Sequence, residues 1–122
     1  MTRALNVWLP VAAWCALIYA LSGRPDLDLN HLAPLWPSLW WLDYPLRKGA
    51  HAVEYCVLFL LVRRGWPTGR AWVFCVIYAI TDEWHQTFVP GRAGRVSDVL
   101  LDSVAAALPW AAARVAPLFR RR

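Results

Sequence analysis

The sequence predicts an all-α polytopic membrane protein with four transmembrane helices. Hydrophobic residues make up 59% of the 122-residue chain and charged residues 17%, against roughly 25% charged residues in an ordinary soluble domain. The charged residues are clustered and leave long apolar runs, and nine tryptophans suit the aromatic belts where membrane meets water. We expect one integral membrane domain over residues 1–122. Its spans cover about residues 5–21, 47–62, 71–88 and 96–118.

The first predicted span, residues 5–21, is about 17 residues long, just enough to cross the hydrocarbon core. Pro10 lies in its first turns, where a missing backbone amide costs little. Only Arg3 and the terminal amine precede the apolar run, and the Ala-Leu-Ser sequence at 20–22 weakly resembles a signal-peptidase site. Retention of this segment and its removal as a signal peptide both stay open, and removal would leave three crossings.

Residues 22–46 form the longest stretch between predicted spans. Its prolines exclude one long helix, and its aromatic residues indicate a segment on the outer side that lies in the membrane interface. We expect His31 to be a solvated loop residue. The prolines are Pro25, Pro34, Pro37 and Pro45, and the aromatic residues are Trp36, Trp40, Trp41 and Tyr44.

Polar residues share one face at the start of the second span. With about 100° of rotation per residue, Lys48, His51 and Tyr55 lie on a narrow face, and Glu54 borders it. The rest of the span is wholly apolar until the Arg63-Arg64 pair. Because the polar face is confined to one end of the second span, we expect it to lie near one surface of the membrane.

The third span ends in the most informative stretch of the chain, residues 82–92. Asp82, His85 and Gln86 share a helix face, with Glu83 at its edge. Ionisable groups in a membrane helix are costly and usually face a bundle interior or a water-filled cavity. The residues of this stretch that we expect only to pack or to lie in the interface are Trp84 and His85.

A turn separates the third span from the fourth. Pro90-Gly91 predicts it, because proline stops a helix and glycine accepts unusual backbone angles. Arg92 follows the turn, where it either faces a pocket or caps the carbonyl end of the third helix. Asp98 and Asp102 lie one turn apart near the start of the fourth span, and Asp98 could also cap that helix.

The positive-inside rule orients the spans. With the N-terminus inside, eight basic residues lie on the inner side and five on the outer side, which together are the thirteen of the chain. All eight acidic residues lie towards the outer side, so both termini are predicted to be cytoplasmic. The inner set is Arg3, Arg63, Arg64, Arg70, Arg114, Arg120, Arg121 and Arg122, and the outer set is Arg24, Arg47, Lys48, Arg92 and Arg95.

Three spans place carboxylates at a similar depth. At 1.5 Å per residue, Glu54, Asp82 and Asp102 each lie roughly 9–10 Å from the outer end of their span. Isolated charges at that depth are costly, so pairing between helices is expected. We therefore predict a polar pocket that opens to the outer face. The basic residues that could pair with the carboxylates are Lys48, Arg92 and Arg95.

The net charge of +5 does not indicate nucleic-acid binding, because no basic face with interleaved aromatic residues is present. The scattered cysteines, Cys15, Cys56 and Cys75, each lie within an apolar run and indicate no disulfide or zinc framework. The chain lacks HExxH-type spacing, and arginines near the carboxylates oppose a bound cation, so we expect no metal and no cofactor. The alternative metal site would use His51, Asp82, Glu83, His85 and Asp98.

Three motifs carry a resemblance to a known family. They are Lys48-x-x-His51-x-x-Glu54-Tyr55, Asp82-Glu83-x-x-Gln86-x-Phe88-x-Pro90-Gly91-Arg92 and Ser97-Asp98-x-x-x-Asp102. In order and spacing, residues 47–108 resemble the VanZ-like family of small bacterial membrane proteins. The resemblance implies a multi-pass protein of the bacterial cell membrane and envelope. The family is named for a protein that lowers susceptibility to teicoplanin, a lipid-bearing glycopeptide antibiotic.

Three functions fit this pattern. The favoured one is a non-enzymatic envelope protein whose outer pocket binds the headgroup of a lipid, a lipid-linked precursor or an amphiphile, and so modulates glycopeptide susceptibility. The second is a membrane enzyme that acts on a lipid-linked substrate. It would use the Glu54/Asp82/Glu83 and His51 cluster, but no activated nucleophile accompanies that cluster and the catalytic residues stay unassigned.

The third function is structural, with buried ion pairs that fix helix register in a small bundle. Four short helices with a polar interior are also compatible with a homo-oligomer. The candidate pocket residues for all three functions are Lys48, His51, Glu54, Tyr55, Asp82, Glu83, Gln86, Arg92, Asp98 and Asp102.

Overall fold

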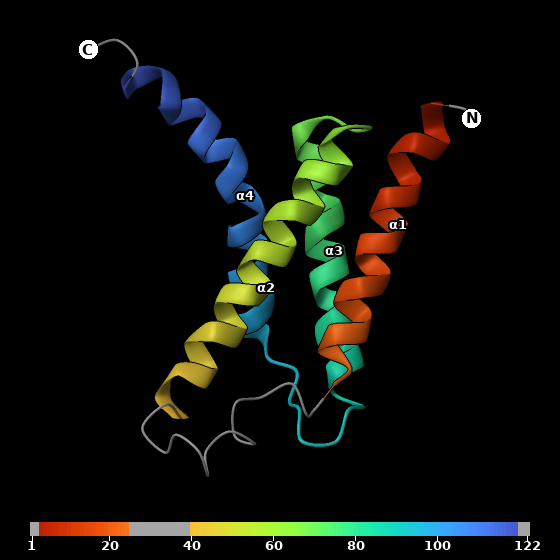
Figure 1. Cartoon of the computed structure of the whole chain (residues 1–122), viewed down its shortest axis with the longest axis vertical. Coiled ribbons are helices and arrows are strands. Elements are labelled where there is room, and N and C mark those ends of the chain that lie inside the picture. Colours follow the sequence, from red (N-terminus) through yellow and green to blue (C-terminus); the bar gives the residue numbers. More distant parts are fainter. Residues whose placement is uncertain (1–2, 25–39, 120–122) are drawn as a thin grey trace.

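The computed structural model describes residues 3–24 and 40–119, which form four α-helices and contain no strand. Helix α1 spans Arg3–Ser22, α2 spans Trp40–Arg63, α3 spans Thr68–Gln86 and α4 spans Val96–Phe119. Successive helices run in opposite directions (Figure 1). The start of α1, the α2–α3 turn and the end of α4 therefore lie at one end of the bundle, and the α3–α4 loop lies at the other. The all-α prediction is confirmed.

Two of the helices have the length and composition of a membrane crossing. Among the described residues these are Ala4–Ser22, with a mean hydropathy of 1.7, and Val96–Ala116, with a mean hydropathy of 1.4. Helices α2 and α3 have no stretch that is equally long and apolar, because charged residues occupy the first turns of α2 and the last turns of α3. Four crossings thus remain a prediction.

The start of α2 differs from the predicted span. The helix begins at Trp40, not at Arg47, and Pro45 lies inside it. The helix therefore starts seven residues before the predicted second span. Pro45 is the sixth residue of α2, just beyond the four first amides that have no intrahelical partner, so it removes one backbone hydrogen bond near the start of the helix. Asp43 and Arg47 form an ion pair one turn apart across it.

The other boundaries shift by a few residues. Helix α3 begins at Thr68 and ends at Gln86, two residues before the predicted Phe88, so the polar residues of the third segment still lie on the helix. The predicted interfacial segment loses residues 40–46 to α2. Its remaining part, residues 25–39, lies outside the described residues, as does His31.

The core lies along α2, whose large buried side chains face small residues of its neighbours. On α3, Ala71, Cys75 and Ala79 recur every fourth residue and are fully buried, and such a stripe of small residues allows close helix approach. Ala105 and Ala106 do the same on α4. The large buried residues of α1 and α2 are Val11, Ile18, Tyr55, Leu58, Phe59 and Val62.

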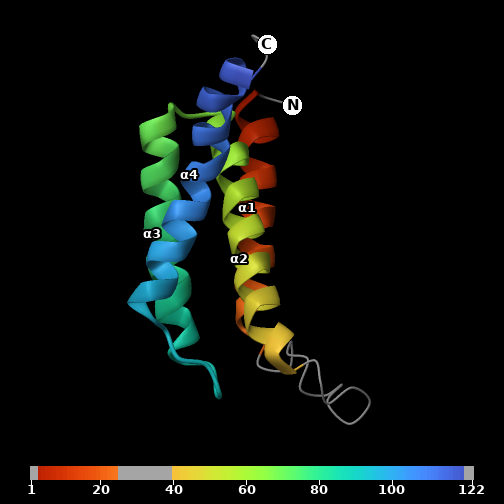
Figure 2. The same ribbon diagram turned by 90° about the vertical axis from the view of Figure 1, so that its left-hand side faces the viewer.

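Helices α1 and α4 lie on opposite sides of the α2–α3 pair (Figures 1 and 2). Helix α4 contacts both α2 and α3, whereas α1 contacts mainly α2. Towards its C-terminal end α4 leans away from the other helices (Figure 1). Large apolar side chains are exposed on every helix, among them Leu9, Val53, Ile77 and Leu100, which fits contact with lipid.

Candidate functional site

The polar residues gather at the end of the bundle that carries the α3–α4 loop. Lys48 of α2 forms an ion pair with Asp98 of α4. One turn further along both helices, Nδ1 of His51 lies 3.8 Å from Oδ2 of Asp102 and 3.9 Å from Oε2 of Glu54. Two matched positions therefore connect α2 and α4, because both helices present a polar residue on each turn of the facing surface.

A second set of contacts joins α1 to α3. The Ser22 hydroxyl donates a hydrogen bond of 2.6 Å to Oδ1 of Asp82, and both side chains are buried. The Gln86 amide donates to Oδ2 of Asp82 at 3.1 Å and to Oε1 of Glu83 at 3.3 Å. Neutral donors thus surround both carboxylates at the end of α3.

Glu83 also anchors the α3–α4 loop. Its Oε2 accepts a hydrogen bond of 2.9 Å from the backbone amide of Arg95. Gly94 packs directly against α3, where an added Cβ would overlap the carbonyl oxygen of Glu83 and lie 2.8 Å from Cγ2 of Thr87. Only glycine permits this approach, so the loop is held close to the end of α3.

The predicted turn at Pro90-Gly91 is confirmed. Gly91 has a φ of 78°, and the amide of Arg92 donates to the carbonyl of Val89 at 3.0 Å. This is a type II turn, with proline second and glycine third. The Arg92 side chain then donates to the carbonyl of Arg24, just past α1, at 3.0 Å. This hydrogen bond lies at the end of α1 and not at the carbonyl end of α3.

Two adjoining cavities open at this end. One has a volume of about 200 Å³ and lies among α2, α3, the loop and α4, and the other, of about 190 Å³, lies between α1 and α2. Arg47, His51 and Arg92 line both cavities. The two cavities therefore adjoin at these side chains, and we call them together the polar pocket.

Seven of the ten candidate residues line the polar pocket. Glu54 faces the cavity beside α1, and the others face the cavity beside the loop. Tyr55, Asp82 and Asp102 do not line it, although Asp82 and Asp102 each contact a residue close to it. The six that line the loop-side cavity are Lys48, His51, Glu83, Gln86, Arg92 and Asp98.

Polar atoms of three residues on α2 and α4 are buried near the pocket. The Tyr55 hydroxyl, both carboxylate oxygens of Asp102 and Nδ1 of His51 have no hydrogen-bond partner among the described residues. Tyr55 is fully buried, and its ring lies 6.3 Å from that of Tyr78. Tyr55 is thus part of the core of the bundle.

Three pocket residues were missed in the sequence. Arg47 and Tyr44 line the polar pocket, and Ser22 both lines it and hydrogen bonds to Asp82. In the sequence, Arg47 indicates only the membrane orientation, and Ser22 indicates only a possible cleavage site. Ser22 could have been found from its position. It ends the first apolar run at the same end of the bundle at which the second and third runs carry their carboxylates.

His85, expected only to pack, stacks on Tyr19 of α1 with ring centroids 3.9 Å apart. Trp84 is exposed and makes an edge contact with Phe88, with ring centroids 5.4 Å apart. Neither residue lines the polar pocket.

Comparison with known proteins identifies the family. A family model described as VanZ/LLP1 matches residues 7–119. The chain belongs to the VanZ/LLP1 family. The match covers all four helices, so the resemblance found in residues 47–108 is confirmed and extends over α1. Its two long apolar helices and its membership of the VanZ/LLP1 family indicate a membrane protein. Searches of curated proteins and of solved structures give no match.

Proposed function

We propose that this VanZ/LLP1 protein binds the anionic headgroup of a lipid, a lipid-linked precursor or an amphiphile in its polar pocket, and that it does so without catalysis. All four helices would cross the cell membrane, with both termini in the cytoplasm and the pocket open to the outer face. The phosphate or carboxylate of the ligand would contact Arg92 and Arg95, while its apolar chain stays in the bilayer.

The proposal rests on one contrast. The carboxylates at the end of α3 have hydrogen-bond donors, whereas two nearby arginines have no carboxylate partner among the described residues. Asp82 and Glu83 accept hydrogen bonds from neutral donors: Ser22, Gln86 and the Arg95 amide. Among the described residues, no carboxylate pairs with the guanidinium of Arg92 or Arg95. Buried Nε of Arg92 also has no partner there.

Arginines without a carboxylate partner are suited to an anion. The guanidinium group is permanently charged and contacts phosphate or carboxylate in a bidentate manner. The other two cations of the polar pocket are neutralised, since Lys48 pairs with Asp98 and Arg47 pairs with Asp43. The two cavities of about 200 Å³ and 190 Å³ each have room for a small polar headgroup, since a water molecule occupies about 30 Å³.

The direction of the helices supports the proposed membrane orientation. Arg63, Arg64, Arg70 and Arg114 lie at the end opposite the polar pocket, and the cytoplasmic side of membrane proteins is enriched in such residues. Binding at the outer face would change the exposure of a headgroup to lipid-bearing glycopeptides. We propose this as the route by which the protein modulates susceptibility to antibiotics such as teicoplanin.

The hydroxyl groups favour binding over catalysis. The Thr87 hydroxyl donates to the carbonyl of Trp84 at 2.6 Å, Ser97 is exposed, and the Ser22 hydroxyl donates to Asp82. No serine or threonine of the described chain is hydrogen bonded to a histidine, which is the usual arrangement of an activated hydroxyl nucleophile.

The direct test is binding of a polyprenyl phosphate by the purified protein in detergent, with the matching uncharged polyprenol as the control ligand. We expect the phosphate to bind at least tenfold more tightly. Arg92→Ala should remove most of that difference, whereas Arg70→Ala, at the opposite end, should not. Equal binding of the two ligands would refute an anion site.

A cellular test connects binding to phenotype. Deletion and overexpression strains are compared for susceptibility to teicoplanin and other envelope-directed compounds. Arg92→Ala should fold, reach the membrane at the wild-type level and lose the phenotype. Asp82→Asn separates the structural alternative, because under that alternative it lowers stability and abundance. If both variants act only through lower abundance, the polar pocket has a structural role alone.

A further inference from the structure

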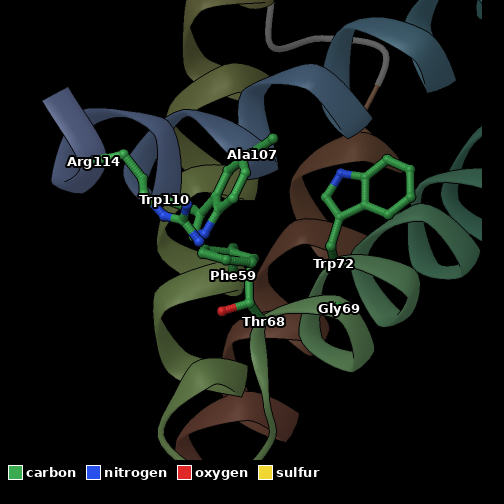
Figure 3. Close-up of a pocket in the computed structure, with 7 residues that line it drawn as sticks. All are labelled: Phe59, Thr68, Gly69, Trp72, Ala107, Trp110 and Arg114. Carbon is green, nitrogen blue, oxygen red and sulfur yellow. The ribbon is translucent and has the colours of Figure 1, made fainter.

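A second cavity lies at the end of the bundle away from the polar pocket. Its volume is about 460 Å³, and it lies open between α2, α3 and the leaning half of α4 (Figure 3). A volume of this size falls within the usual range for small-molecule sites, about 300–1,000 Å³. We call it the aromatic groove. Its lining residues are Phe59, Thr68, Gly69, Trp72, Ala107, Trp110 and Arg114.

The walls of the aromatic groove are apolar. Figure 3 shows the aromatic side chains of Phe59, Trp72 and Trp110, which come from three different helices and line the groove. The one polar atom of the Trp72 ring, Nε1, donates to the carbonyl of Ser103 at 2.9 Å. The hydrogen-bonding need of Trp72 is therefore satisfied, and its ring offers an apolar surface to whatever occupies the groove.

One cation marks the rim. The guanidinium carbon of Arg114 lies 4.9 Å from the ring centroid of Trp110, a cation–π contact that holds it over the groove. Arg63, Arg64 and Arg70 are exposed at the same end. Among the described residues, the carboxylate nearest to this end is Glu54, and no carboxylate forms an ion pair with Arg114. This end is therefore cationic.

We propose that the aromatic groove holds one anionic phospholipid from the cytoplasmic leaflet. The phosphate of its headgroup contacts Arg114, and one acyl chain lies against Phe59, Trp72 and Trp110. The charge of the rim and the apolar walls match the two halves of such a lipid. Basic pockets between membrane helices on the cytoplasmic side recognise anionic headgroups in the same way.

The start of α3 adds to the attraction at the rim. Helix α3 begins at Thr68 with no side-chain cap, and Gly69 has open space around its Cα. The helix dipole favours negative charge at this point. The headgroup assignment depends on the groove and on Arg114, and the helix start only reinforces it.

This inference is separate from the proposed ligand of the polar pocket. On α2, the polar-pocket residue nearest to Phe59 is Glu54, five residues before it, which corresponds to roughly 7.5 Å along the helix axis. No residue lines both the aromatic groove and the polar pocket. Either binding site could therefore be absent without affecting the other.

The test is native mass spectrometry of the purified full chain, titrated with phosphatidylglycerol or phosphatidylcholine that carry identical acyl chains. We expect one phosphatidylglycerol to bind about tenfold more tightly than phosphatidylcholine. Arg114→Gln should reduce this preference about fivefold. Arg70→Gln, an exposed arginine at the same end that does not line the groove, should change it less than twofold.

A second variant tests the groove without changing charge. Ala107→Leu places a larger side chain in the groove and should weaken binding of both lipids at least threefold. Circular dichroism establishes that each variant keeps its helix content. The loss of preference caused by Arg114→Gln should be the same with and without Arg92→Ala, which distinguishes this site from the polar pocket.

Three outcomes would overturn the proposal. They are equal binding of the two lipids by the wild type, an equal loss in Arg70→Gln and Arg114→Gln, and a lipid-free dimer that Ala107→Leu dissociates. The second outcome would indicate a diffuse surface potential, and the third would indicate that a second copy of the chain occupies the groove.

Discussion

The polar end of the bundle buries carboxylates, whereas the opposite end keeps its charges at the surface. Asp82, Glu83 and Asp102 are each at most 5% exposed, and ion pairs and hydrogen bonds connect them and their neighbours between all four helices. At the other end, Arg64 and Arg70 are exposed and the helices meet through aromatic and small side chains.

The difference shows how one small bundle can combine a defined register with an open groove. Charged and hydrogen-bonded contacts are directional, so they hold the polar end in one alignment. Apolar contacts at the other end are not directional, and α4 leans away there (Figure 1). Four substitutions test whether the polar end does carry more of the stability, measured as the free energy of unfolding in mixed micelles.

The largest expected effect is at the ion pair between α2 and α4. Lys48→Met leaves Asp98 without its cation, and the Asp98 side chain is only 14% exposed. Removing one partner of a buried pair costs about 3–5 kcal/mol, and we expect about 3 kcal/mol here because the pair is partly exposed.

The matched control is Arg70→Met at the opposite end, which should change stability by less than about 0.5 kcal/mol. The double variant Lys48→Met/Asp98→Leu should recover most of the loss, since an apolar pair can replace an ion pair. A double variant as unstable as Lys48→Met would mean that the lysine acts through packing.

The next effect is at the contact between α1 and α3. Ser22→Ala removes the 2.6 Å hydrogen bond to Asp82, and a hydrogen bond to a charged group contributes about 1.5–3 kcal/mol. We expect a loss of about 2 kcal/mol. Ser97→Ala, at an exposed serine, should have no measurable effect. Similar values for the two variants would show that Ser22 does not stabilise the buried carboxylate.

A smaller effect is expected in the loop that positions the arginines. An added methyl group at Gly94 would overlap the Glu83 carbonyl oxygen, so Gly94→Ala should cost about 1.5 kcal/mol and weaken anion binding, because the loop must shift. Gly49→Ala, on α2 with open space around it, should stabilise the protein by about 0.5–1 kcal/mol. A neutral Gly94→Ala would show that the loop moves freely away from α3.

The smallest effect is expected at the aromatic groove. Trp72→Phe removes the 2.9 Å hydrogen bond to the Ser103 carbonyl, which should cost about 1 kcal/mol. Trp84→Phe changes an indole that is 65% exposed and makes no hydrogen bond in the described part of the chain, and it should be neutral. A loss from Trp72→Phe larger than that from Lys48→Met would reverse the comparison between the two ends.

The sequence by itself determined the four helical segments, the turn at Pro90-Gly91 and the side of the bundle on which the acidic residues lie. These features follow from local rules, namely runs of apolar residues, the fixed rotation of a helix and the backbone preferences of proline and glycine. The same rules misplaced the start of α2, because a proline just behind the first turn is tolerated where few backbone hydrogen bonds are lost.

Only the tertiary structure decided which groups meet. Periodicity places Lys48 and Asp98 on faces of their helices but not opposite each other, and it does not reveal that Ser22 donates to Asp82. The aromatic groove was likewise invisible in the sequence, because its walls come from three helices and its volume depends on the direction of α4. Partner choice and cavity shape depend on how whole helices pack, and a single chain segment does not encode that.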